Sequence, residues 1–124
     1  MAIDFSLTPE LEAIRARVRT FVNDVIRPGG EIIDGKGDKE ALTGEDRLKA
    51  LIGMRKQARS EGLWLPHMPE EWGGMGLGHV ELAMVQAEAA RSYYGPWVLN
   101  GQAPDEGNMH TLLNWATDAQ KEKY

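Results

Sequence analysis

The sequence predicts an all-α fold, a single helical bundle that spans residues 1–124. Apolar residues recur at spacings of three and four in several windows, which is the period of an amphipathic helix. Clusters of proline and glycine separate these windows and mark the connections. There is no convincing two-residue hairpin turn and no sustained alternation of apolar and polar residues, so no strand is predicted.

A long amphipathic helix is expected first, from Leu7 to Arg27. Thr8 can cap it, and Pro9 at its first position loses no hydrogen bond. Its apolar stripe covers about five turns and consists of Leu11, Ile14, Val18, Phe21, Val22 and Val25. We expect Pro28-Gly29-Gly30 to end this helix. The polar, glycine-containing residues 30–44 predict a mobile loop.

Two further helices and an ordered loop are predicted in the middle of the chain. The second helix begins near Thr43, ends at Gly62 and carries an apolar stripe of Leu48, Leu51 and Ile52. Residues 62–78 are rich in glycine, proline and tryptophan and predict an ordered loop held by Trp64 and Trp72. The third helix runs from about His79 to Ser92 and buries Leu82, Val85 and Ala89.

The C-terminal third predicts one or two helices between Pro96 and Ala116 and a short one after them. Pro104-Asp105-Glu106 suits a first helical turn, with Met109, Leu112 and Leu113 as the core face. Thr117 and Gln120 form a capping box, which normally begins a helix. Because that helix reaches Tyr124 without a stop signal, we expect the chain to be a fragment of a longer protein.

Composition excludes several classes of function. With 14 Lys and Arg against 19 Asp and Glu, the net charge is -5, which argues against binding nucleic acid. No apolar run approaches the roughly 20 residues of a membrane span, and no secretory signal is visible. The absence of cysteine excludes a disulfide scaffold and a thiolate metal site, and it fits a cytoplasmic location.

No residue pattern predicts a metal ion or a phosphate-binding loop in this chain. The three histidines, His67, His79 and His110, are far apart in the sequence and form no HExxH motif. A metal site assembled in three dimensions is an alternative, but separate surface or partly buried histidines are the favoured interpretation. Residues 73–78 lack the spacing of a dinucleotide fingerprint and predict a tight turn before a helix. Residues 34–45 depart from a calcium loop at two positions.

The order of features resembles the N-terminal helical domain of the acyl-CoA dehydrogenases. The resemblance rests on the long first helix, on the loop Gly62-Leu63 through Pro69-Glu70-Glu71-Trp72-Gly73-Gly74-Met75-Gly76, on Glu81-Leu82-Ala83, and on Gln120-Lys121-Glu122-Lys123-Tyr124. The run from Asn100 to Met109 is similar to a stretch of the long-chain subgroup that includes mammalian members ten and eleven. The glycine-rich residues 29–44 depart from the family pattern.

This resemblance implies a three-domain flavoenzyme that removes hydrogen from the α and β carbons of an acyl-CoA thioester. FAD accepts the hydride, an electron-transferring flavoprotein accepts the electrons, and the enzyme forms a dimer or tetramer. The catalytic base and the FAD contacts belong to later domains, so we expect no catalytic residue and no bound FAD in residues 1–124. A free-standing helical interaction module without catalysis is the alternative function.

The resemblance also implies that this domain lines the far end of the acyl-tail pocket. By their position against the tail-lining helix of the family, the candidate residues are Val98, Leu99, Gln102 and Glu106. The alternative interpretation makes Val98 and Leu99 ordinary core residues and residues 102–108 a helix-capping turn without substrate contact.

Overall fold

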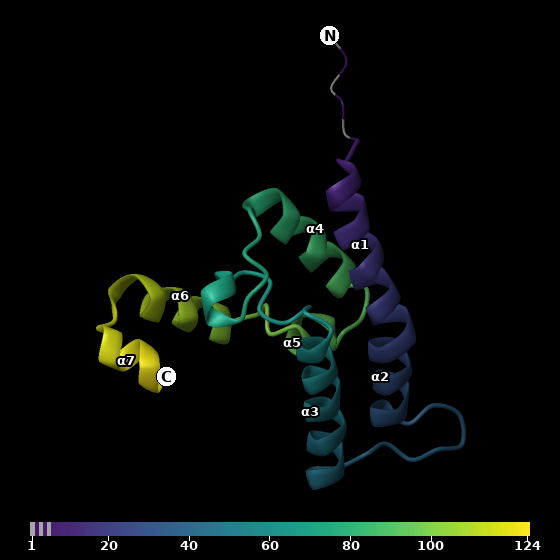
Figure 1. The fold of residues 1–124 in the computed structure, drawn as a ribbon. Coiled ribbons are helices and arrows are strands. Elements are labelled where there is room, and N and C mark those ends of the chain that lie inside the picture. Colours follow the sequence, from purple (N-terminus) through teal and green to yellow (C-terminus); the bar gives the residue numbers. More distant parts are fainter. Residues whose placement is uncertain (1, 3, 5) are drawn as a thin grey trace.

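A computed structural model describes residues 2, 4 and 6–124, and within these residues the fold is all-α, as predicted. Figure 1 shows an upright body, which contains the helices between Pro9 and Val98, and an arm, which contains the last two helices, between Asp105 and Lys123. The α-helices are α1 (Pro9–Phe21), α2 (Arg27–Asp34), α3 (Gly44–Ser60), α4 (His79–Ala89), α5 (Gly95–Val98), α6 (Asp105–Trp115) and α7 (Asp118–Lys123). A π-helical turn, Val22–Ile26, joins α1 to α2, and a 3₁₀ turn, Glu70–Trp72, lies in the loop before α4.

The first helix begins where the sequence predicts but does not end there. The Thr8 hydroxyl accepts a hydrogen bond from the Leu11 amide at 3.3 Å, which confirms the cap. The rod then continues through Pro28-Gly29-Gly30 to Asp34 (Figure 1), so the predicted stop is wrong. Pro28 lies in the first turn of α2, directly after the wider π turn, and a proline is tolerated in a first turn.

The two glycines after Pro28 serve close packing between helices. A Cβ atom on Gly29 would lie 2.5 Å from the Met54 sulfur of α3, and one on Gly30 would lie 2.8 Å from the Tyr94 ring. A side chain at either position would therefore force Met54 or Tyr94 to shift. These glycines therefore let α3 and Tyr94 approach the rod, and they do not interrupt the helix.

Helix α3 spans the predicted residues but buries a different face. Met54 and Ala58 are buried, whereas Leu48 is 51% exposed and Ile52 is 39% exposed. The stripe predicted from Leu48 and Ile52 is therefore wrong, although Leu51 is partly buried against the core. The reason is that α3 packs against both α2 and α5, and this contact lies on the Met54 side.

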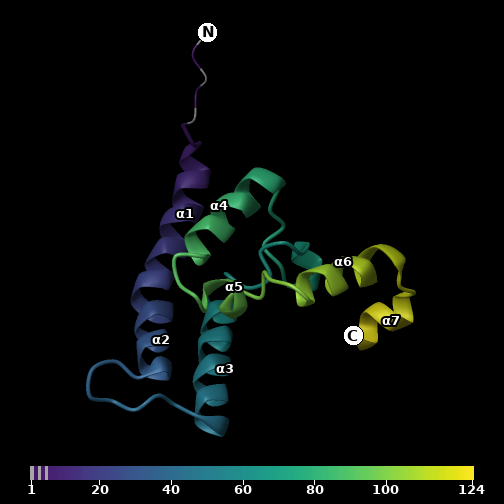
Figure 2. The same ribbon diagram turned by 180° about the vertical axis from the view of Figure 1, so that it is seen from behind.

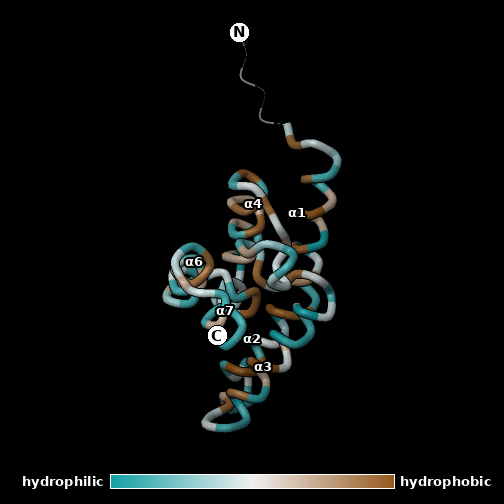
Figure 3. The backbone as a smooth tube through the Cα atoms, turned by 60° about the vertical axis from the view of Figure 1, so that its left-hand side comes forward, coloured by the Kyte–Doolittle hydropathy of each residue, from teal (hydrophilic) through white to brown (hydrophobic). Residues whose placement is uncertain are grey.

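The core lies where α1, α4 and α5 meet. Helix α4 packs along α1, and hydrophobic residues recur along both helices (Figure 3). Val85 and Ala89 of α4 are fully buried, as predicted, against Val18 and Phe21 of α1. At this contact, Nε of Arg19 donates to the buried Glu88 carboxylate at 3.2 Å, and Arg91 donates to the same carboxylate at 3.2 Å.

Residues 61–78 form an ordered loop, although not mainly through the two tryptophans. Leu63, Leu65 and Met68 are buried, and Leu63 belongs to the main hydrophobic core, whereas Trp72 is 37% exposed. Trp64 is partly buried beneath the Arg55 guanidinium, 5.3 Å from its ring centroid. The expectation that Trp72 holds the loop is therefore corrected, because the aliphatic side chains do so.

Helices α6 and α7 extend away from the body, and Figures 1 and 2 show this arm from opposite sides. Pro104 precedes the first turn of α6, as predicted. Thr117 and Gln120 form the predicted capping box at the start of α7, where the Thr117 amide donates to Gln120 Oε1 at 2.9 Å. Within the described residues, no helix is long and apolar enough to cross a membrane.

Candidate functional site

The predicted pocket residues Val98 and Leu99 lie in the core. They are 0% and 1% exposed, respectively, and both belong to the main hydrophobic cluster. Asn100 follows in the left-handed conformation, with φ of 56°, which asparagine tolerates better than most residues. This turn redirects the chain, so that the next residues leave the core and enter α6.

Gln102 lines a cavity of about 280 Å³ on the surface of the body. The cavity is lined by Arg47, Leu51, Tyr93, Tyr94, Trp97 and Gln102. Gln102 is partly buried, and its backbone carbonyl accepts a hydrogen bond from the Glu106 amide at 3.0 Å. The residue therefore accepts a hydrogen bond from the start of α6 and also contributes to the wall of the cavity.

Tyr94 supplies a polar group to this cavity. Its hydroxyl donates a hydrogen bond to the Asp34 carboxylate and accepts one from Arg47 Nη2 at 3.0 Å. Burial raises the pKa of Tyr94, and the hydrogen bond to Asp34 raises it further, while Arg47 acts in the opposite direction. The phenol therefore stays protonated at neutral pH and donates to Asp34.

Arg55 of α3 holds the backbone that leads to Gln102. Its Nε donates to the Trp97 carbonyl at 3.0 Å, and its Nη2 donates to Asn100 Oδ1 at 3.3 Å. The guanidinium also lies over the Trp97 ring. Burial lowers the pKa of Arg55, and the charge of Asp105 partly offsets this; arginine nevertheless stays charged in proteins.

Glu106, the fourth predicted pocket residue, lies apart from the Gln102 cavity and close to two histidines. Nδ1 of His67 is 3.2 Å from Nε2 of His110, and a Glu106 oxygen lies within 4.8 Å of both nitrogen atoms. From the sequence, a metal site assembled in three dimensions is only the less favoured alternative, because His67 and His110 belong to separate segments. The available signal was the four-residue spacing of Glu106 and His110, which places both on one helix face.

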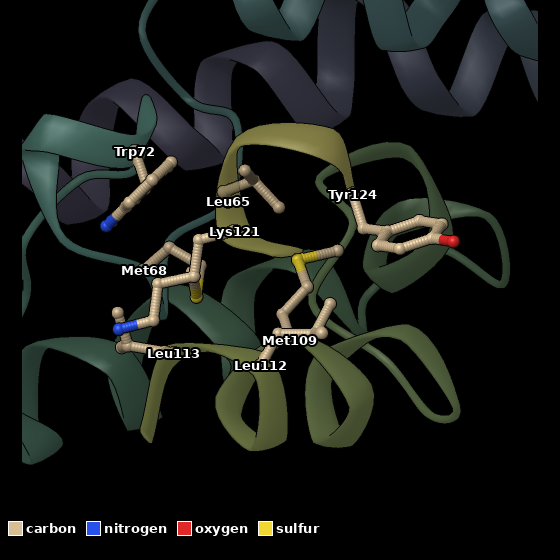
Figure 4. A pocket seen from close by; sticks show the side chains of 8 residues that line it. All are labelled: Leu65, Met68, Trp72, Met109, Leu112, Leu113, Lys121 and Tyr124. Atoms are coloured by element: carbon tan, nitrogen blue, oxygen red, sulfur yellow. The ribbon is translucent and has the colours of Figure 1, made fainter. Parts of the chain in front are cut away.

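A second, more apolar cavity of about 140 Å³ lies between the loop before α4 and the arm. Figure 4 shows Met109, Leu112 and Leu113 of α6 meeting Leu65, Met68 and Trp72 of the loop, with Lys121 and Tyr124 of α7 alongside. Met109, Leu112 and Leu113 thus share one face of α6, as predicted, but none of them is buried. This face packs against the loop rather than in the main core.

The glycine-rich residues 73–78 form the tight turn that the sequence predicts. The amides of Gly74, Met75 and Gly76 donate to the carbonyls of Pro69, Leu65 and Met68 at 3.0, 3.2 and 2.9 Å. A Cβ atom on Gly74 would overlap the Met68 backbone, which explains the glycine. Because these amides are used inside the turn, they do not cradle a phosphate.

Comparison with known proteins gives the family of the chain. Residues 8–124 match the model of the acyl-CoA dehydrogenase N-terminal domain. The chain belongs to this family. The resemblance stated from the sequence is thus confirmed over almost the whole chain.

The chain is also similar in sequence to individual acyl-CoA dehydrogenases. The chain is 34% identical over 115 residues to acyl-CoA dehydrogenase family member 11 of Rattus norvegicus, covering 91% of the chain and 14% of the relative. It is 36% identical over 76 residues to family member 10 of Mus musculus, covering 57% of the chain and 7% of the relative. Similarity to members ten and eleven is therefore confirmed.

A solved structure shares the fold. A structure described as a putative acyl-CoA dehydrogenase from Mycobacterium abscessus aligns with a TM-score of 0.73 and 28% identity, covering 95% of this chain and 31% of that one. The chain spans less than a third of the length of each relative described here.

Proposed function

We propose that this chain is the N-terminal helical domain of an FAD-dependent acyl-CoA dehydrogenase that introduces an α,β double bond into acyl-CoA thioesters. The match of residues 8–124 to the N-terminal domain family is the observation that carries the proposal. The enzyme acts in the cytoplasm as a dimer or tetramer and passes its electrons to an electron-transferring flavoprotein.

In this proposal the domain lines the far end of the acyl-tail pocket. Gln102 supplies an amide to a cavity whose other walls include Trp97 and Leu51. Val98 and Leu99 support the pocket wall from the core side, and Arg55 fixes the Trp97–Asn100 turn. Glu106, in the first turn of α6, is not among the residues that line this cavity, and we assign it no part in the pocket wall. A wall of this kind selects among acyl tails by its shape. It also disfavours a tail that leaves the Gln102 amide without a hydrogen-bond partner.

The chemical steps belong to parts of the enzyme outside this domain. When bound, FAD supplies the acceptor for the hydride that leaves the β carbon. The amides of the glycine-rich turn are not free to hold a flavin phosphate, because they donate to the carbonyls of Pro69, Leu65 and Met68. We assign neither the catalytic base nor a flavin contact to this chain, and we expect it to be inactive by itself.

The experiment uses a longer protein that contains this chain together with the β and C-terminal helical domains. That protein is expected to purify with flavin and to reduce an artificial electron acceptor only when an acyl-CoA is added, with the enoyl-CoA as product. Residues 1–124 alone are expected to carry no flavin. A longer protein without flavin or acyl-CoA-dependent reduction would favour a non-catalytic interaction module instead.

A further inference from the structure

A cluster of three potential metal ligands joins the body to the arm. His67 comes from the loop after α3 and is 7% exposed, while Glu106 and His110 lie one turn apart on α6. One ligand atom from each residue lies within 4.8 Å of the other two. The proposed enzyme activity uses neither histidine.

The hydrogen bonds of His67 fix which of its nitrogen atoms is free to bind a ligand. Nε2 of His67 lies 3.0 Å from the Asn100 carbonyl oxygen. A carbonyl only accepts hydrogen bonds, so Nε2 carries the proton and Nδ1 of the neutral ring presents a lone pair toward His110. Metal-binding histidines commonly donate their second ring N–H to a backbone carbonyl in this way.

The spacing of the two imidazoles also suits one ion. Zinc binds histidine nitrogen at roughly 2.0–2.1 Å, so two nitrogens of a tetrahedral site lie about 3.3 Å apart. Nδ1 of His67 and Nε2 of His110 are 3.2 Å apart. An ion can therefore replace their mutual hydrogen bond with little movement of the rings, provided that His110 carries its proton on Nδ1.

We propose that His67 Nδ1, His110 Nε2 and a Glu106 carboxylate oxygen bind one divalent transition-metal ion of the zinc type. Two imidazoles and one carboxylate favour Zn²⁺, Co²⁺ or Ni²⁺ over Mg²⁺ and Ca²⁺, which prefer oxygen ligands. Water occupies the fourth position.

The ion would clamp the arm to the body. None of the residues of α6 is buried, and the arm projects from the remaining helices (Figures 1 and 2). A metal bridge between His67 and α6 would therefore stabilise a contact that apolar packing secures only weakly. This inference does not depend on the proposed enzyme activity.

The test titrates the chelator-treated, dialysed protein with Zn²⁺ by isothermal titration calorimetry, with Mg²⁺ as the comparison ion. We expect one equivalent of Zn²⁺ to bind and to raise the melting temperature, and Mg²⁺ to do neither. His110→Ala should weaken Zn²⁺ binding by roughly a hundredfold or more, because loss of an outer-shell partner already costs about 10–100-fold. Glu106→Gln should weaken it as well.

His79→Ala is the matched control. His79 is exposed at the start of α4, so its removal should leave Zn²⁺ affinity unchanged. Since His67 is buried and its replacement can disturb folding, Co²⁺ bound to the unmodified protein gives a second measurement. Its visible spectrum should have the intensity and position of a four-coordinate nitrogen and oxygen site. Absence of stoichiometric Zn²⁺ binding, wild-type affinity in His110→Ala, or a six-coordinate Co²⁺ spectrum would overturn the proposal.

Discussion

The guanidinium carbon of Arg55 lies 3.6 Å from the centroid of the Trp97 ring. This cation–π contact connects α3 to α5. The same side chain donates hydrogen bonds to the Trp97 carbonyl and to the Asn100 side chain. These contacts span the turn that carries Val98 and Leu99 into the core and directs Gln102 outward. Arg55 is therefore the residue through which the body sets the position of the proposed pocket wall.

Replacing Arg55 with lysine is expected to destabilise the chain by about 1–2 kcal/mol, because lysine keeps the charge but loses the planar stacking and the second hydrogen bond. Urea denaturation followed by circular dichroism measures the change. Arg59→Lys is the control on the same helix, since Arg59 is exposed, and it should change the stability by less than roughly 0.5 kcal/mol. If Arg55→Lys were as stable as Arg59→Lys, the proposed role of Arg55 would be wrong.

The buried carboxylate of Glu88 predicts a pH-dependent contribution to stability. The hydrogen bond from Arg19 holds the pKa of Glu88 below its ordinary value of 4.5, against the opposing effect of burial. A lowered folded-state pKa means that the stabilisation is fully present above 4.5 and is lost as the pH falls through the folded-state value. At pH 7, Glu88→Gln should therefore unfold with a free energy about 1–2 kcal/mol lower than that of the wild type.

The difference between Glu88→Gln and the wild type should shrink as the pH is lowered below 4.5, the ordinary pKa of the group. Glu45→Gln is the control, because Glu45 forms an exposed pair with Lys49 at 2.9 Å, and such pairs contribute little. The test measures the unfolding free energies of the wild type and both variants from pH 3 to pH 7. A Glu88→Gln difference that stays constant over this range would contradict the assignment.

Two glycines on neighbouring helices should respond to alanine in opposite directions. A Cβ atom on Gly95 would overlap the Ala89 carbonyl oxygen, whereas one on Gly53 would meet no atom within 4 Å. Gly95→Ala should therefore destabilise the chain by about 1–3 kcal/mol. Gly53→Ala, inside α3, should stabilise it by about 0.5–1 kcal/mol. Thermal and urea unfolding measure the change in the free energy of unfolding for each variant. An unchanged stability of Gly95→Ala would contradict the close packing of α4 on α5.

Helix starts could be predicted from the sequence because their signals are local. Thr8, Pro104 and Thr117 each lie within a few residues of the groups that they cap or precede. The end of the first helix could not be predicted in the same way. Pro28-Gly29-Gly30 predicts a stop, but Gly29 and Gly30 instead pack closely against Met54 and Tyr94, which are distant in the sequence.

The candidate site could be proposed only through resemblance to a family. The composition of residues 98–106 points to no chemistry on its own, and nothing local indicates that Val98 and Leu99 face the core while Gln102 faces a cavity. The contact between His67 and His110 joins residues 43 positions apart. This contact depends on how α6 packs against the loop after α3. The spacing of apolar residues along the sequence does not predict that packing.

The proposed acyl-tail role of Gln102 is tested most directly by chain-length selectivity in a longer protein that contains this chain. We predict that Gln102→Leu changes the ratio of kcat/KM between acyl-CoA substrates of neighbouring chain length by roughly tenfold, since a methylene in such a pocket is worth about 1–3 kcal/mol. Gln57→Leu, on the exposed side of α3, should leave the ratio unchanged. Parallel chain-length profiles for the wild type and Gln102→Leu would contradict the placement of the acyl tail against this domain.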